Sequence, residues 1–150
     1  MNMNQNQVEI VHLQEKKFIG IPVTSSFQNH DPKRVEATKE SFLNRKHEIK
    51  NVINSNEYVC PHFSSEVLFT YFFCMEVSSL EDIPEGMIGF TTPPHSYATT
   101  RTEKDPYEEI HTYLANNGFE NNSKALALEV YQFEDPEWPG KVDVFVPVID

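Results

Sequence analysis

The pattern of apolar and polar positions in the first half of the chain predicts two strands, one helix and two further strands. The four stretches with a strand pattern are residues 7–13, 18–23, 58–63 and 67–77. Asp31-Pro32 is a favourable helix start, and apolar residues then recur at helical spacing as far as Ile53. The last strand is apolar on both sides, which is typical of a central strand with both faces covered.

The second half of the chain repeats this order of elements after a turn-rich segment at 78–89. Its strand patterns lie at residues 96–102, 125–133 and 142–148. Asp105-Pro106 begins a second helix, with Glu108 at the capping-box position, and Gly118 ends it. The two Asp-Pro pairs lie about half a chain length apart, so we interpret the chain as two copies of one unit.

These elements predict an α+β fold in which two strand-helix-strand-strand units share one antiparallel sheet. We expect both helices on one face of the sheet and a ligand groove on the other, because pockets favour the seams between structural units. The expected repeats span about residues 16–77 and 94–149, within a single domain of residues 7–150. Residues 1–6 lack the features of a signal peptide, and we expect them to be a disordered lead-in.

The net charge of the chain limits the kinds of partner that it is expected to bind. The chain has 150 residues, with 12 Lys and Arg against 23 Asp and Glu, and its net charge is −11. All of the excess lies in residues 76–150. Because such a surface repels phosphates, we expect no direct nucleic-acid partner and no membrane partner. No apolar run is long enough to span a bilayer. The sequence therefore predicts a cytoplasmic globular protein that is open to a cationic ligand or a basic partner.

Other chemically active residues form no recognised motif. Cys60 and Cys74 are expected to be reduced, packed thiols, because the predicted hairpin does not place them opposite each other. Together with His62 and His95 they lack the paired spacing of a zinc site, so no metal is expected. The five glycines form neither a phosphate loop nor a dinucleotide fingerprint, and no cofactor is expected.

Glu129 is the most informative residue, because it interrupts an otherwise apolar strand. Alternation places Leu128 and Val130 on one side, which we expect to face the helices. Glu129 and Tyr131 then lie on the other, open face among aromatic side chains. A carboxylate there is costly to desolvate unless a cation or a hydrogen-bond donor stabilises it. The alternative is a glutamate that is exposed to water or paired with a lysine.

Several segments resemble the GyrI-like domain, the effector-binding domain found alone and at the C-terminus of AraC-type and multidrug-responsive MerR-type regulators. They are Leu128-Glu-Val-Tyr131 with the acidic loop 134–138, the closing strand 142–148, Ile83-Pro-Glu-Gly-Met87 and Pro94-His-Ser-Tyr97. The resemblance covers residues 7–149. It implies a bacterial domain of the SOUL/GyrI-like fold that binds hydrophobic, aromatic or cationic small molecules, in drug or toxin sensing or sequestration.

The resemblance also implies the site. In this family the Glu of a Glu-X-Tyr strand is the pocket carboxylate, and it corresponds to Glu129. Cation-π contacts around one buried anion suit such ligands. The candidate ligand-binding residues are Glu129, Tyr131, Tyr71, Phe73, Tyr97 and Trp138. For each aromatic residue, ordinary core packing is the alternative.

The chain departs from the regulators, because a domain that uses all 150 residues leaves no room for a DNA-binding segment. We therefore expect a stand-alone member. Such members of the family include small-molecule binders, inhibitors of DNA gyrase and hydrolases of reactive cyclopropane-bearing compounds. Two alternatives to simple binding stay open. An acidic surface at Glu134, Asp135 and Glu137 would dock on a basic partner such as gyrase. In a hydrolase, Glu129 would activate water with help from Tyr131 or Tyr71.

Overall fold

Nine strands and two α-helices make up the part of the chain that the computed structural model describes, residues 8–26, 32–65 and 67–149. The helices are α1 (Pro32–Arg45) and α2 (Pro106–Asn117), and a short 3-10 helix, η1 (Lys46–Glu48), follows α1. The strands are β1 (Glu9–Leu13), β2 (Lys16–Ser26), β3 (Glu57–Val59), β4 (His62–Ser64), β5 (Leu68–Val77), β6 (Ile88–Thr92), β7 (His95–Thr100), β8 (Leu128–Gln132) and β9 (Val142–Pro147).

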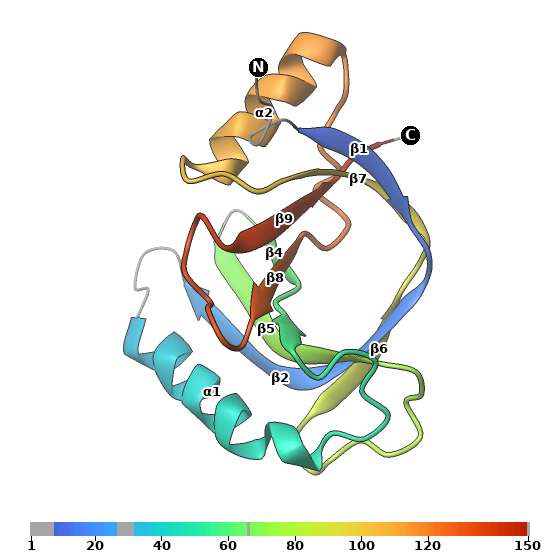
Figure 1. Cartoon of the computed structure of the whole chain (residues 1–150), viewed down its shortest axis with the longest axis vertical. Coiled ribbons are helices and arrows are strands. Elements are labelled where there is room, and N and C mark those ends of the chain that lie inside the picture. Colours follow the sequence, from blue (N-terminus) through green and yellow to red (C-terminus); the bar gives the residue numbers. More distant parts are fainter. Residues whose placement is uncertain (1–7, 27–31, 66, 150) are drawn as a thin grey trace.

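All of these strands join one antiparallel sheet in the order β1-β7-β9-β8-β3-β5-β2-β6, and β4 pairs with β5 beside this path. The central pair is β3 with β8, where Tyr58 lies opposite Tyr131. The order β3-β5-β2 on one side matches β8-β9-β7 on the other. The sheet curls, and both helices lie outside the curl (Figure 1). The expected α+β class, with the helices on one face of a shared antiparallel sheet, is confirmed.

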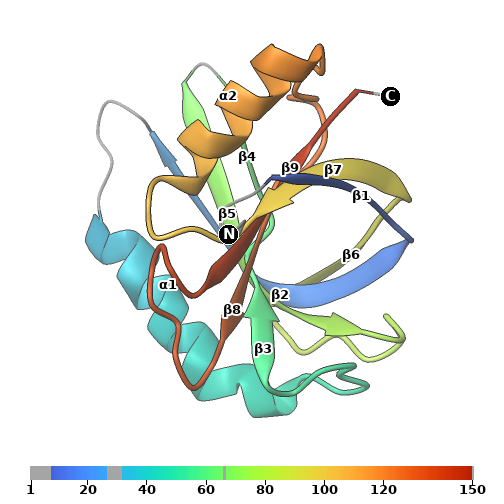
Figure 2. The same ribbon diagram turned by 45° about the horizontal axis from the view of Figure 1, so that its top comes forward.

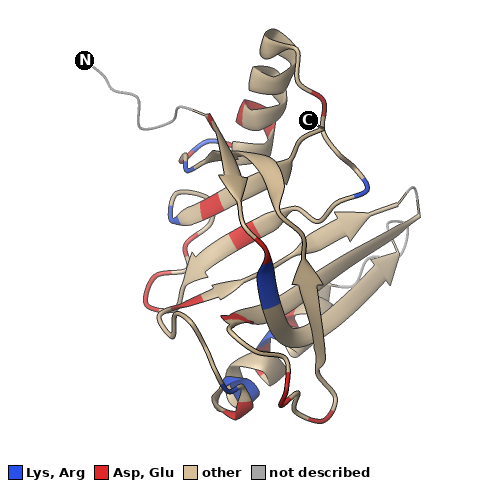
Figure 3. Cartoon of the chain, turned by 90° about the vertical axis from the view of Figure 1, so that its right-hand side faces the viewer, with Lys and Arg blue, Asp and Glu red and all other residues tan. Residues whose placement is uncertain are grey.

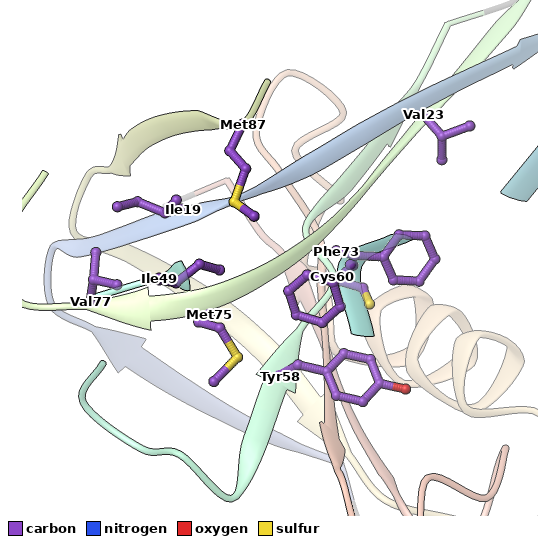
Figure 4. Close-up of a cluster of buried hydrophobic side chains, with 10 residues drawn as sticks. Ile19, Val23, Ile49, Tyr58, Cys60, Phe73, Met75, Val77 and Met87 are labelled. Atoms are coloured by element: carbon purple, nitrogen blue, oxygen red, sulfur yellow. The ribbon is translucent and has the colours of Figure 1, made fainter. Parts of the chain in front are cut away.

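The convex face of the sheet carries two apolar clusters beneath the helices. One lies under α1, where Phe42 is fully buried in a cluster with strand residues such as Tyr58 and Phe73. Figure 4 shows Tyr58 and Phe73 among the buried side chains of this cluster. The other lies under α2, whose Ile110 and Leu114 pack on β7 and β9. The two helices thereby fix the outer layer on either side of the central β3–β8 pair, as a second view shows (Figure 2).

The concave face is lined by a third apolar cluster: Phe18, Val59, Phe72, Cys74, Tyr97 and Leu128. The strand β5 contributes to both faces, as its two-sided apolar pattern predicts, with Phe73 on one face and Phe72 on the other. The close pairing of β2 with β5 requires Gly20, since a Cβ there would lie 1.9 Å from the carbonyl oxygen of Phe73. The concave side is therefore lined by apolar side chains from both units, and it holds a cavity of about 210 Å³.

The first helix is shorter than its apolar pattern predicts. It ends at Arg45, and the chain then passes through η1 to Ile49, whose backbone is extended. The Arg45 guanidinium donates to Glu48 at 2.8 Å and to the carbonyl oxygen of Glu85 at 2.7 Å. These contacts fix the turn, which brings Ile49 into the core. The expectation of a continuous helix to Ile53 was wrong, because tertiary contacts end it.

Two strand assignments also change. The predicted strand at 58–63 is divided into β3 and β4 at Cys60-Pro61, where proline has no N–H to continue a ladder. The strand β6 begins within the segment 78–89, which we expected to form turns. It pairs with β2 from Gly20↔Ile88 to Lys16↔Thr92. Its pairing partner lies about 70 residues earlier in the chain, so local sequence gives little sign of it.

The second helix begins and ends as the sequence predicts. The Asp105 carboxylate accepts hydrogen bonds from the backbone N–H groups of Tyr107 at 3.0 Å and Glu108 at 3.3 Å. Gly118 ends the helix in the left-handed conformation, with φ of 74°. The expected cap at Asp31 and the lead-in at 1–6 lie outside the described residues. No described helix is long and apolar enough to cross a membrane.

Both cysteines are free thiols, as predicted, and both are buried. Cys60 lies between β3 and β4 and Cys74 lies on β5, and they face opposite sides of the sheet, Cys60 in the convex cluster and Cys74 in the concave one. Side chains on opposite faces of a sheet cannot bridge. Burial also raises the pKa of each thiol, so both stay protonated near neutral pH.

Acidic positions are spread over strands, helices and loops, and they outnumber the basic ones (Figure 3). On the loop after β8, Glu134, Asp135 and Glu137 are all exposed, and Asp135 lies 3.7 Å from the ammonium of Lys141. This loop forms one acidic segment of a generally acidic surface. Docking of a basic partner on it stays a prediction.

Candidate functional site: a carboxylate held by three tyrosines

Glu129 lies on β8 near the centre of the sheet, and only 7% of the residue is exposed. Backbone hydrogen bonds join it to Cys60, with 2.7 Å from the Cys60 nitrogen to its carbonyl oxygen and 3.2 Å in the reverse direction. On its other side it pairs with Val144 of β9. The carboxylate is therefore built into the sheet, and the alternative of a water-exposed strand-end glutamate is wrong.

Three tyrosine hydroxyls donate hydrogen bonds to this carboxylate. Tyr71 of β5 and Tyr131 of β8 donate to Oε1, the latter at 2.8 Å. Tyr107, in the first turn of α2, donates to Oε2 at 2.5 Å. Hydrogen bonds to an ionised acceptor are about twice as strong as neutral ones. These hydrogen bonds offset much of the free-energy cost of burying the charge, and they link β5, β8 and α2 to the same carboxylate.

The three phenols are held in their neutral form. Burial raises the pKa of Tyr71, Tyr107 and Tyr131 above the ordinary tyrosine value, and the Glu129 carboxylate raises each of them further. A neutral phenol keeps the proton that it donates. The carboxylate and its donors therefore form a stable unit at neutral pH.

This arrangement predicts a loss of stability in alkali. In the unfolded chain tyrosines ionise at about pH 10, whereas in the folded protein these three keep their protons. Above about pH 10 the unfolded state binds fewer protons, so the free energy of unfolding falls as pH rises, by up to about 1.4 kcal/mol per pH unit for each tyrosine. Urea denaturation between about pH 9 and 11 measures the slope. Tyrosinate absorbance from all six tyrosines of the folded protein near pH 10 would contradict the prediction.

No lysine or arginine of the described residues forms an ion pair with Glu129. Its one ion-pair contact among them is with His62, whose Nε2 lies 4.0 Å from Oε2 and is charged only when protonated. The alternative in which a lysine neutralises Glu129 is thus wrong. The negative charge is stabilised by dipoles, which leaves its longer-range field available to a ligand.

An aromatic cavity of about 310 Å³ lies beside this unit, and two of the three tyrosines form part of its wall. The helix α1 supplies Val35, Glu36 and Lys39, and the loop after β8 supplies Pro136 and Trp138. The remaining lining residues come from the strands: Tyr58, Phe69, Tyr71, Phe73 and Tyr131. Tyr58 and Tyr131 stack with ring centroids 5.1 Å apart, which fixes a flat floor.

Four of the five predicted aromatic residues come together here, namely Tyr71, Phe73, Tyr131 and Trp138. Trp138 lies at the rim, 45% exposed, with its ring centroid 6.1 Å from that of Tyr107. Tyr97 does not join them. It lies in the concave cluster, edge-on to Phe145, because its neighbour Ala98 takes the position facing α2.

The cavity beside Glu129 lies on the helix-bearing face, whereas we expected Glu129 to face a groove on the opposite side. A second cavity of about 210 Å³ does lie on that concave side, among residues such as Phe18, Val59 and Leu128, but Glu129 is not part of its lining. Leu128 lies in the concave cluster and not against the helices, and Glu129 points to the side that carries Tyr107 of α2. Alternation along a strand defines two sides but does not say which one the helices cover. The residues that we expected to share one side of β8 do share it. The side that we expected to face the helices is the concave one, and the other side faces the helices.

The sequence does not indicate two of the residues that contact Glu129 in the structure. Tyr107 follows the Asp105-Pro106 helix start directly, and a position in the first helical turn gives no sign of a partner on a strand. The sequence pattern presents His62 only as a possible metal ligand. In the structure its Nδ1 lies 3.1 Å from the carbonyl oxygen of Cys60, and its Nε2 lies 2.9 Å from the Tyr107 hydroxyl.

A sheet of two like units that carries a buried carboxylate among aromatic rings is the architecture expected of an effector-binding domain. Residues 9–148 match the family model Cass2, described as integron-associated effector binding protein, and the chain belongs to this family. The predicted GyrI-like, effector-binding class is thereby confirmed. No curated protein matches the sequence.

Solved structures show the same fold at low sequence identity. The C-terminal domain of EcmrR is similar with a TM-score of 0.68 and 11% identity, over 97% of this chain and 98% of that one. SAV2435 bound to tetraphenylphosphonium gives a TM-score of 0.65 and 15% identity, over 95% and 94%. The integron cassette protein VCH_CASS2 from the mobile metagenome of Vibrio cholerae gives 0.63 and 14%, over 97% of both chains.

Proposed function

We propose that this domain binds hydrophobic aromatic cations in the cavity beside Glu129, as a sensing or sequestering protein for drug-like or toxic compounds in the cytoplasm. One observation carries the proposal: a buried carboxylate is held by neutral phenols and has no lysine or arginine partner among the described residues. A ligand cation would supply the missing counter-charge. The similar fold of SAV2435, bound to tetraphenylphosphonium, supports a ligand of this class.

The cavity suits such a ligand in shape and in chemistry. Its volume of about 310 Å³ lies at the lower end of small-molecule sites, which suits one or two aromatic rings of a ligand. The rings of Tyr71 and Tyr131 stand between the cavity and the carboxylate, so a cation over their faces gains cation-π attraction as well as the field of Glu129. Lys39 and Glu36 at the α1 wall offset each other in charge.

Tetraphenylphosphonium and tetraphenylborate test the proposal, because they have nearly the same shape and opposite charge. We expect the phosphonium to bind with a Kd in the micromolar range, about 1–100 µM, and the borate to bind at least about a hundredfold more weakly. Calorimetry measures both affinities. Trp138, the single tryptophan, lies at the rim and gives a second readout through its fluorescence. Equal or tighter binding of the borate would overturn the proposal.

A further inference from the structure

The cavity of about 210 Å³ on the concave face, here called the concave cavity, is separate from the cavity beside Glu129. None of the described residues lines both of them. Six of the side chains that line the concave cavity are apolar and four are charged. The two cavities therefore differ in their chemistry as well as in the face of the sheet that carries them.

Strand alternation arranges the lining of the concave cavity into an apolar floor and a charged mouth. Side chains two positions apart on a strand share a face. On three strands a charged residue and an apolar residue two positions further along both line the cavity: Lys16 and Phe18, Glu57 and Val59, and Asp143 and Phe145. Phe18 and Val59 are buried, whereas the charged lining residues are all half-buried. The floor therefore suits an apolar group, and the mouth suits a charged one.

Two of the three carboxylates at the mouth already have a cationic partner. Glu76 lies 3.3 Å from the ammonium of Lys16. Asp143 accepts two hydrogen bonds from the guanidinium of Arg101, both at 2.9 Å. The third carboxylate, Glu57, forms no ion pair with a lysine, arginine or histidine of the described residues. A cation that enters the mouth would therefore meet Glu57 as its counter-ion.

The surroundings of Glu57 favour such a cation. Its carboxylate accepts hydrogen bonds from two neutral amides, of Asn54 at 3.0 Å and of Gln132 at 3.4 Å. Burial raises the pKa of Glu57, and so do the nearby carboxylates of Glu76 and Asp143, against the opposing effect of the two amides. A positive charge at the mouth would relieve this repulsion between carboxylates.

We infer that the concave cavity binds a linear alkylammonium ion, with the alkyl chain on the apolar floor and the ammonium beside Glu57. The cavity is smaller than ordinary small-molecule sites of about 300–1,000 Å³, which favours a slim chain over a fused ring system. An ammonium brings three donors to a carboxylate that has acceptor capacity left. A fatty acid of the same length would meet repulsion instead. The inference does not rest on the proposed function, because the aromatic cavity takes no part in it.

The two cavities can be occupied at the same time, because they use alternate residues of the same strands. Tyr58 and Tyr131 line the aromatic cavity, whereas Val59 and Val130, the next residue on β3 and the preceding one on β8, line the concave cavity. The sheet itself lies between the two ligands. A bulky aromatic cation and an alkylammonium ion are therefore not expected to compete.

Octylammonium and octanoate test the inference, since they have nearly the same length and opposite charge. Near pH 8 an alkylamine is cationic, as lysine is, whose pKa is about 10.4. We expect octylammonium to bind with a Kd of about 0.1–1 mM and octanoate to bind at least about tenfold more weakly. Calorimetry measures both affinities. Equal or tighter binding of octanoate would overturn the inference, and so would the absence of octylammonium binding.

A substitution and an NMR measurement locate the bound ion. We expect Glu57→Gln to weaken octylammonium binding by about tenfold, and the matched control Glu81→Gln, at an exposed position after β5, to change it less than about twofold. Methyl NMR of the natural protein is expected to show shifts at Leu13 and Val130 and none at Val35, which lines the aromatic cavity. Equal effects of the two substitutions, or shifts at Val35 alone, would overturn the inference.

Competition separates this inference from the proposed function. We expect the affinity for octylammonium to be the same, within about twofold, with and without saturating tetraphenylphosphonium. If the phosphonium displaces octylammonium, both ions bind in the aromatic cavity, which overturns the concave site and leaves the proposed function standing. If the phosphonium does not bind at all, the proposed function is overturned, and the octylammonium measurements on the natural protein still decide the concave site.

Discussion

Replacement of Glu129 by glutamine is expected to lower the affinity for tetraphenylphosphonium by about a hundredfold, which is about 2.7 kcal/mol. The amide has the same shape and still accepts from Tyr71 and Tyr131, so the wall of the cavity is preserved. What it lacks is the charge. A cation that enters the cavity then loses its counter-ion in a poorly solvated place, where the loss of one charge of a pair costs several kcal/mol.

The matched control is Glu134→Gln, on the exposed loop that follows β8. It removes the same charge by the same chemical change, but at a solvated position where salt screens the field. We expect an affinity change of less than about twofold. If both variants weaken binding equally, the acidic surface as a whole attracts the ligand and the buried carboxylate does not recognise it. An unchanged affinity of Glu129→Gln would remove the basis of the proposed function.

Replacement of Phe42 by alanine is expected to lower the free energy of unfolding by about 3–5 kcal/mol. Phe42 is fully buried and is the residue through which α1 is anchored to the sheet. Its ring lies 5.8 Å from that of Tyr58, 6.2 Å from that of Phe73 and 6.5 Å from that of Phe133. Tyr58 and Phe73 also line the ligand cavity, so the same packing supports the site. Urea denaturation measures the loss.

Leu43, the next residue along α1, supplies the control because it is 37% exposed. The change Leu43→Ala removes a large side chain from the same helix with little effect on helix propensity, and we expect a cost below about 1 kcal/mol. Equal costs for the two variants would mean that α1 does not present Phe42 to the sheet. The placement of the cavity wall beside this helix would then be wrong as well.

The sequence was informative wherever a local rule governs structure. The Asp105 cap and the Gly118 end of α2 follow from hydrogen bonding and backbone sterics within a few residues. The two-sided apolar pattern of β5 correctly indicates a covered central strand. The apolar pattern predicted the end of α1 wrongly. Arg45, the last residue of this helix, is held by Glu48 and by Glu85, which is forty residues away in sequence.

The sequence by itself determined that a carboxylate at Glu129 interrupts an apolar strand and shares its side with Tyr131, because side chains alternate along any strand. Only the tertiary structure decided which face that side occupies and what meets the carboxylate there. Tyr71, Tyr107 and His62 come from separate elements and reach Glu129 through strand register and helix docking. Register and docking depend on long-range packing, which local spacing does not encode. For the same reason Tyr97, an equally plausible aromatic in the sequence, faces the other side of the sheet.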